Sequence, residues 1–235
     1  MVAPARPSVS TRGLYLRKRQ KTRERLLQAA KRVMAETGAE AATIAEIAAA
    51  ADVSPGTFYN YFQTREEILD AVAVSLVEEF RRVMDAIQRA VDDPAERIAI
   101  AIRLFLGRVR DDRLWGWFMA RYAPTLPILR DQTREIIRER IVADGLRRRR
   151  FRLPSTRAVG DLIAGTSVTA LRSILEGRAP IEIATEVAEL VLRGLGVPLV
   201  DAHRIANRPI PPLTLPPTQA SGKDFTNEFP VARSP

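Results

Sequence analysis

Apolar residues recur every three or four positions along most of the chain, with charged residues between them. This spacing is typical of amphipathic helices, and no stretch shows the alternation that indicates a strand. The pattern therefore predicts an all-α fold. We expect helices over residues 20–37, 43–51, 55–61, 64–90, 127–144 and 155–176, another from residue 94 onward, and a last one from residue 180 to about Gly194.

Two short helices between Thr43 and Phe62 each begin at a capping signal. Thr43 is followed three residues later by Glu46, the spacing of a capping box, in which each side chain bonds the other's backbone N–H. Ser54 is a favourable N-cap, and Pro55 fits the first helical position, where no N–H is needed. The stretch predicts a helix-turn-helix whose second helix is about two turns long.

The second of these helices has a small polar face, while Phe58 and Phe62 can turn inward to anchor it. The major groove of B-DNA admits such a helix, and N–H groups at a helix N-terminus suit phosphate oxygens. The alternative is an ordinary helical hairpin with amphipathic tyrosines on its surface. The polar face consists of Gly56, Thr57, Tyr59 and Asn60.

The run from Thr43 through DVSPGTFYNYFQTREEIL closely resembles the DNA-binding domain of the TetR (tetracycline-repressor-like) family of transcriptional regulators. The resemblance is strong over residues 20–70 and implies a second helix in the major groove and a dimer on a palindromic operator. It also implies a small-molecule effector in the C-terminal domain that releases the DNA. We expect a DNA-binding domain over residues 17–63, with these contact residues: Arg17, Lys18, Thr43, Ser54, Pro55, Gly56, Thr57, Tyr59, Asn60, Tyr61 and Arg65.

Charge is concentrated at the N-terminus. The formal net charge is +9, and in the first 32 residues Glu24 is the one acid among many basic residues. Residues 1–16 lack periodicity and are interpreted as a disordered basic arm that lies against phosphates or enters a groove. A solubilising tail is the alternative. Arg65 stands where the resembling family usually has a phosphate-contacting lysine.

Residues 64–196 are expected to form a helical ligand-binding and dimerisation domain. A capping box of Thr64 and Glu67 opens a long helix that can connect the two domains. An aromatic cluster predicts a cavity for a small apolar or aromatic effector, although a plain core is the alternative. The candidate ligand-binding residues are Phe105, Trp115, Phe118, Met119, Tyr122 and Thr166, with Arg103 and Arg121 as further polar candidates.

A basic run, Arg147 to Arg150, raises the idea of a phosphate-bearing effector such as an acyl-coenzyme A. A solvated charged loop is the favoured interpretation. The last two helices, over residues 155–176 and 180–194, carry apolar faces, and the resemblance implies a homodimer through them. Core packing within a monomer is the alternative.

The sequence gives no support for an enzyme, a metalloprotein, or a secreted or membrane protein. There is no cysteine, the only histidine is His203, and no catalytic spacing is visible, so we expect no enzyme activity, no cofactor and no metal site. No secretory signal or uninterrupted apolar span indicates a membrane partner, so a cytoplasmic location is expected. Residues 197–235 are rich in proline and are interpreted as an extended, disordered tail.

The sequence as a whole predicts a ligand-responsive, sequence-specific DNA-binding regulator, and a repressor rather than an activator. Its partners would be double-stranded operator DNA, a small effector and a second copy of the chain. The alternative is a sequence-tolerant, nucleoid-type DNA-binding protein without an effector. A preference of about a thousandfold or more for one site over unrelated DNA distinguishes the two.

Overall fold

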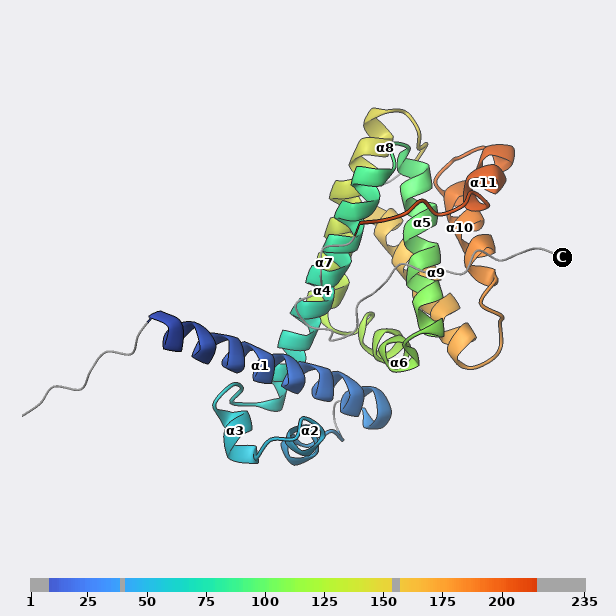
Figure 1. The fold of residues 1–235 in the computed structure, drawn as a ribbon. Helices are drawn as coiled ribbons and strands as arrows, with labels where there is room; N and C mark the ends of the chain where they lie inside the picture. The colour runs from blue at the N-terminus through green and yellow to red at the C-terminus, as the bar shows by residue number, and fades with distance from the viewer. Residues whose placement is uncertain (1–8, 39–40, 154–156, 215–235) are drawn as a thin grey trace, which may run out of the picture. The chain divides into compact units, whose positions relative to one another are not determined.

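The computed structural model describes residues 9–38, 41–153 and 157–214 (Figure 1). These residues are helical, with turns and loops between the helices and no strand among them. The chain divides into two compact units, Met1–Val72 and Ala73–Pro235. The all-α prediction is confirmed. The border between these two units lies inside a helix.

The first unit contains three helices and the start of a fourth. They are α1 (Val9–Thr37), α2 (Ile44–Ala50), α3 (Pro55–Tyr59) and α4 (Arg65–Ala90). α2 packs against α1, and α3 follows beside α2 (Figure 1). Gly38 has a φ of 95° and ends α1 in a left-handed conformation, which glycine adopts readily at a helix C-terminus.

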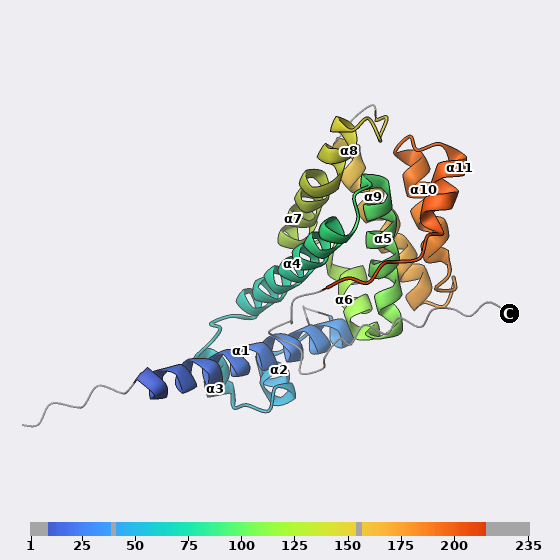
Figure 2. The same cartoon turned by 45° about the horizontal axis from the view of Figure 1, so that its top comes forward.

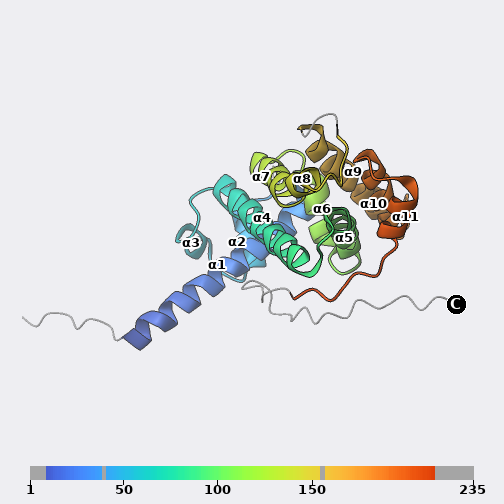
Figure 3. The same ribbon diagram turned by 90° about the horizontal axis from the view of Figure 1, so that it is seen from above.

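The second unit holds the rest of α4 and a bundle of helices. These are α5 (Pro94–Gly107), α6 (Arg113–Tyr122), α7 (Pro127–Ile137), α8 (Ala143–Arg147), α9 (Arg157–Leu175), α10 (Ile183–Gly194) and α11 (Leu199–Ala206). A 3₁₀ turn, Arg108–Arg110, follows α5. α5 lies beside α10 and α11 in Figures 2 and 3, and α6 packs on α9.

The first helix is longer than predicted, because α1 begins at Val9. Residues 9–16 are therefore helical rather than a disordered arm, while residues 1–8 lie outside the described part of the chain. Most residues between Leu14 and Lys21 are good helix formers, so a helix nucleated further along can propagate backward through them. The side chains of Leu14, Tyr15 and Leu16 are exposed on this extension.

The helix predicted over residues 127–144 continues past Gly145. α7 passes through a π-helical turn, Arg138–Val142, into α8, which ends at Arg147. Gly145 is buried, and a Cβ there would lie 2.0 Å from Cε2 of Phe151. This glycine therefore permits a close approach of the Phe151 ring instead of ending the helix.

The tail also differs from its prediction. α11 occupies residues 199–206, with Ala202, Ile205 and Ala206 buried against α5 and α10. The amphipathic pattern of α11 extends over only eight residues, and the prolines on either side of it led to the prediction of an extended tail. Residues 207–214 have no helical structure, and residues 215–235 lie outside the description.

One described helix is long and apolar enough to cross a membrane by length and composition alone. Residues Ala158–Leu175 of α9 have a mean hydropathy of 1.2. In this fold α9 packs against α5, α6, α7 and α10. A bundle helix meets the same criterion as a membrane span, so this stretch is weak evidence for a membrane.

Candidate DNA interface and ligand cavity

The helix-turn-helix begins at two side-chain caps. The Thr43 hydroxyl accepts a hydrogen bond from the Glu46 N–H at 3.2 Å, and the Glu46 carboxylate accepts one from the Thr43 N–H at 2.8 Å. These bonds from Thr43 hold the pKa of Glu46 below its usual value. The Ser54 hydroxyl accepts from the Thr57 N–H at 3.1 Å, and Pro55 occupies the first helical position. Both predicted starts are confirmed.

The turn between α2 and α3 is held by arginines from α1. Asp52 has a φ of 53°, a left-handed conformation that aspartate tolerates better than most residues. Arg25 donates to the carbonyl oxygens of Ala51 and Asp52 and pairs with the Asp52 carboxylate at 3.1 Å. Arg32 donates to the carbonyl oxygen of Ala50 at 3.0 Å. These two arginines, counted only as basic charge in the sequence, therefore position the turn.

The two faces of α3 differ sharply in exposure. Phe58 and Phe62 are 0% and 2% exposed and pack together, with 5.9 Å between their ring centroids. Tyr59 is 47% exposed and Asn60 is exposed, whereas Thr57 is half-buried. The predicted polar residues therefore form an open surface over an aromatic anchor, which is the arrangement that a major groove can receive.

Gly56 contributes to the openness of this surface. A Cβ at Gly56 would meet only the Ser54 hydroxyl oxygen, at 3.9 Å. Packing within the chain does not require a glycine there, so a close approach by a partner is a reason for its small size. Ser54 and Pro55, which precede Gly56, are also exposed, and so is Thr43 at the start of α2.

The remaining predicted contacts lie on α1, after α3 and at the start of α4. Arg17 and Lys18 are exposed on α1. Tyr61 is half-buried, with the guanidinium of Arg19 5.8 Å from its ring centroid. Arg65 is half-buried and pairs with Glu66 at 3.1 Å. The cation–π contact of Arg19 was not visible in the sequence, because it joins α1 to a residue 42 positions later.

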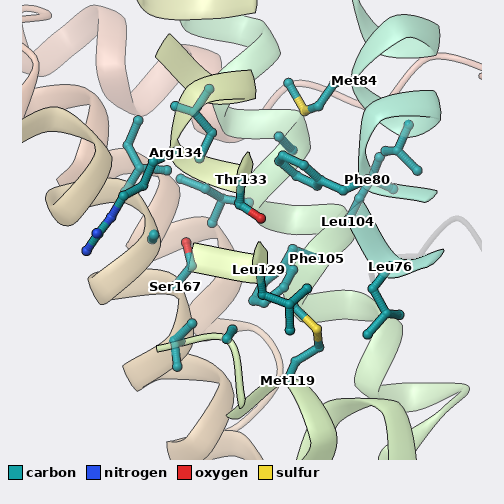
Figure 4. Close-up of a pocket in the computed structure, with 18 of the residues that line it drawn as sticks. Leu76, Phe80, Met84, Leu104, Phe105, Met119, Leu129, Thr133, Arg134 and Ser167 are labelled. Atoms are coloured by element: carbon teal, nitrogen blue, oxygen red, sulfur yellow. The ribbon is translucent and has the colours of Figure 1, made fainter. Parts of the chain in front are cut away.

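The second unit encloses a cavity of about 390 Å³ between α4, α5, α6, α7 and α9 (Figure 4). Its wall is mainly apolar and includes Leu76, Phe80, Met84, Leu104 and Leu129. This proportion of apolar to polar lining is typical of small-molecule sites. The polar residues on the wall are Glu79, Arg108, Arg130, Thr133, Arg134, Ser167 and Thr169.

Half of the predicted ligand-binding residues lie on this wall. Phe105, Trp115 and Met119 line the cavity, whereas Phe118, Tyr122 and Thr166 do not. Phe118 and Tyr122 pack on each other elsewhere in the core, with ring centroids 4.6 Å apart. Residues 115 and 119 share one face of α6, and residues 118 and 122 share another. Helical spacing predicts both faces of α6, but it does not predict which of the two lines the cavity.

The arginines on the wall are paired with acids. Arg108 pairs with Glu79 and lies 4.4 Å from the Trp115 ring centroid. Arg130 pairs with Asp131 at 2.8 Å, and Arg134 pairs with Asp161. Within the described residues, the buried Nε atoms of Arg108 and Arg134 have no hydrogen-bond partner.

The two further polar candidates lie outside the cavity wall. Arg103 donates to the carbonyl oxygen of Arg208, and its burial lowers its pKa. Arg121 is exposed. Neither residue lines the cavity.

The basic run at residues 147–150 belongs to an ion-pair network. Arg148 pairs with Asp92 at 2.8 Å, and Arg150 pairs with Asp93 at 3.1 Å. Asp144 accepts from Arg97 at 3.0 Å, and the Arg97 side chain is only 6% exposed. The loop is therefore tied to α5 rather than merely solvated, and its arginines lie outside the cavity wall.

The described residues contain no group of three or more histidine, cysteine or acidic side chains able to hold a metal ion. His203 is exposed on α11 and lies 2.8 Å from the Glu189 carboxylate.

An exposed recognition helix on a helix-turn-helix defines a DNA-binding protein. Residues 26–72 match the family model described as bacterial regulatory proteins, tetR family, and residues 93–208 match that of the tetracyclin repressor-like C-terminal domain. The chain belongs to the TetR family of transcriptional regulators.

Two curated relatives agree with this assignment. The regulator TcmR of Streptomyces glaucescens is 34% identical over 104 residues, covering 44% of this chain and 46% of TcmR. BetI of Rhizobium meliloti is 38% identical over 82 residues, covering 35% of this chain and 40% of BetI. The chain thus spans less than half the length of these curated relatives. Both are named as transcriptional regulators and not as enzymes.

Among solved structures, RolR in complex with the ligand resorcinol has a TM-score of 0.64 and is 34% identical, covering 84% of this chain and 98% of RolR. FadR from Bacillus subtilis in complex with stearoyl-CoA has a TM-score of 0.63 at 22% identity, which shows a shared fold.

Proposed function

We propose that this protein is a ligand-responsive, sequence-specific transcriptional repressor, which binds a palindromic operator as a homodimer and is released by a small apolar or aromatic effector. The observation that carries the proposal is the open polar face of α3 above the buried Phe58 and Phe62. A regulator of this kind works on chromosomal DNA, so we place it in the cytoplasm.

The proposed division of labour on the DNA follows from side-chain chemistry. Thr57 and Asn60 carry short polar groups suited to base edges in the major groove. Tyr61 and Arg65, together with Arg17 and Lys18, suit phosphate oxygens, which position the protein without reading sequence. Gly56 allows the start of α3 to approach the groove.

The apolar surface of α9 and α10 supports the homodimer. Leu162 on α9 is 36% exposed and Leu190 on α10 is 58% exposed. Only 33% of the Ala158–Leu175 stretch is buried within one chain, although its mean hydropathy is 1.2. A second copy meeting these helices would cover them and supply a second α3 for the other half of an operator.

The cavity supports an effector. RolR, which is 34% identical to this chain, binds resorcinol, a small aromatic molecule. α4 is one helix that carries Arg65 at its first residue and Leu76, Phe80 and Met84 on the cavity wall. A ligand that displaces these wall residues would act on the same helix that enters the DNA-binding unit. Coupling then requires that this helix adopt two arrangements, one of which the ligand favours.

Selection of DNA fragments from a random pool, followed by competition with unrelated DNA, tests the proposal. We expect one palindromic sequence to be bound at least about a thousandfold more tightly than unrelated DNA. Comparable affinity for all DNA would instead favour the nucleoid-type alternative, for which the exposed basic start of α1 would be sufficient.

Substitutions then separate base-reading from phosphate-binding residues. Thr57→Ala and Asn60→Ala should change which base pairs are preferred, by about 1–3 kcal/mol per base pair. Tyr61→Ala and Arg65→Ala should weaken binding equally for all operator variants and reduce its salt dependence. Uniform losses in all four variants would contradict the division.

A further inference from the structure

Two hydroxyl groups face the cavity of the second unit without a protein partner. Ser167 on α9 is only 6% exposed, and Thr133 on α7 is half-buried. Neither hydroxyl forms a hydrogen bond with any residue that the structure describes. Figure 4 shows both oxygen atoms directed toward the space enclosed by the lining side chains.

This lack of a partner is unusual for hydroxyls on helices. Serine and threonine within a helix often donate to the carbonyl oxygen four residues earlier, as Thr37 does to Val33 at 2.9 Å. Neither oxygen is among the fully buried side-chain atoms of the described residues, so each is open to the cavity, where a bound molecule can supply the missing hydrogen bond. Thr169 also lies on the wall, but it is exposed and water can serve it.

The charges on the wall argue against an anionic occupant. The guanidinium of Arg134 pairs with Asp161, that of Arg130 with Asp131, and that of Arg108 with Glu79. A carboxylate or phosphate on a ligand would leave water to meet guanidinium charges that these acids already balance, although the Nε–H groups of Arg108 and Arg134 still lack a hydrogen-bond partner among the described residues.

The apolar part of the wall suits an aromatic ring. Phe80, Phe105 and Leu129 offer flat or branched apolar surfaces, and Met84 and Met119 offer polarisable sulfur atoms that favour contact with rings. The wall thus combines apolar side chains with the neutral hydroxyls of Thr133 and Ser167.

We infer that the effector is an uncharged aromatic molecule bearing a hydroxyl group, which Thr133 and Ser167 bind by hydrogen bonds. Each side-chain hydroxyl can donate or accept, so the pair can both receive the proton of the ligand hydroxyl and donate to its oxygen. The inference rests on the proposed effector role of the cavity and names the class of ligand for it.

Calorimetric titration of the full chain with three bicyclic probes of matched shape tests the inference. The probes are 2-naphthol, 2-methylnaphthalene and 2-naphthoate, which differ only in a hydroxyl, methyl or carboxylate group. We expect 2-naphthol to bind at least about tenfold more tightly than either of the others, because only it satisfies the two hydroxyls without burying a charge.

The double variant Thr133→Val, Ser167→Ala removes both hydroxyls at nearly constant volume. Its preference for 2-naphthol over 2-methylnaphthalene should fall below about threefold, while 2-methylnaphthalene binds as in the parent protein. Thr166→Val is the matched control, since Thr166 lies next to Ser167 but not on the wall, and it should keep the full preference. Melting curves of each variant verify that it is folded.

Three results would overturn the inference: no binding of any probe, equal or better binding of 2-naphthoate, or an unchanged preference in the double variant. Operator affinity measured with and without 2-naphthol tests the proposed function separately. If the hydroxyl preference holds but operator binding is unaffected by the probe, the effector role fails while the hydroxyl contact remains. If the preference is absent but the protein still selects an operator, the DNA-binding role remains.

Discussion

The two units use buried and exposed positions in opposite ways. In the first unit, Phe58 and Phe62 fill the core, and the polar groups of α3 face outward. In the second unit, the helices surround a volume that they do not fill, and Ser167 and Thr133 face into it. A surface that reads DNA needs a rigid, fully packed base, whereas a ligand site needs a region of incomplete packing.

Arginine also serves the two units differently. Arg25 and Arg32 donate to backbone carbonyl oxygens and so hold the turn before α3. In the second unit, Arg97 is nearly buried and joins α5 to Asp144 by an ion pair. The first use positions an exposed loop at low cost, and the second places a charge where breaking its pair is expensive.

The largest expected effect is that of Phe58→Ala in the first unit. Phe58 is fully buried, so its removal should lower the free energy of unfolding by about 3–5 kcal/mol and melt this unit first. Tyr59→Ala is the control, because Tyr59 is 47% exposed and should cost under about 1 kcal/mol. Hydrogen exchange of α2 and α3 amides checks this, and equal protection in both variants would contradict the anchor role.

The second unit should be weakened next by Arg97→Met. Loss of one partner of a buried pair costs about 3–5 kcal/mol, but Asp144 keeps Arg147 and Arg148, so we expect the lower end, about 3 kcal/mol. Arg130→Met, at an exposed pair, should change stability by less than about 1 kcal/mol. Thermal unfolding measures both, and similar melting temperatures would show that the network is not stabilising.

A cap substitution should have a smaller effect, confined to the first unit. Ser54→Ala removes the acceptor for the Thr57 N–H and should cost about 1 kcal/mol, whereas Ser54→Asp should restore most of that loss. Urea unfolding that follows the amides of α3 measures the difference. Full stability in the alanine variant would mean that Pro55 alone suffices to start the helix.

The smallest expected effect is an increase in stability, and a comparison of two glycines of the second unit tests it. Gly165 lies inside α9, and a Cβ there would meet nothing within 4 Å, so Gly165→Ala should stabilise by about 0.5–1 kcal/mol. Gly145→Ala should instead destabilise, because its Cβ would overlap the buried Phe151 ring. If both variants shift the melting temperature in the same direction, the packing described around Gly145 or around Gly165 is wrong.

The sequence by itself determined the starts of α2, α3 and α5, the helix-turn-helix and the family. The caps at Thr43, Ser54 and Asp93 and the left-handed Gly38 were all predictable, because each acts through atoms within a few residues along the chain. The exposure of Tyr59 and Asn60 over Phe58 followed in the same way from helical spacing.

Tertiary structure alone decided the roles that depend on distant neighbours. It placed Trp115 and Met119 on the cavity wall but Phe118 and Tyr122 away from it, set Gly145 against Phe151, and gave Arg25 and Arg150 protein partners. It also brought Thr133 and Ser167 to one cavity from different helices. Helical periodicity defines the faces of each helix, but the partner of each face depends on how helices distant in sequence pack together.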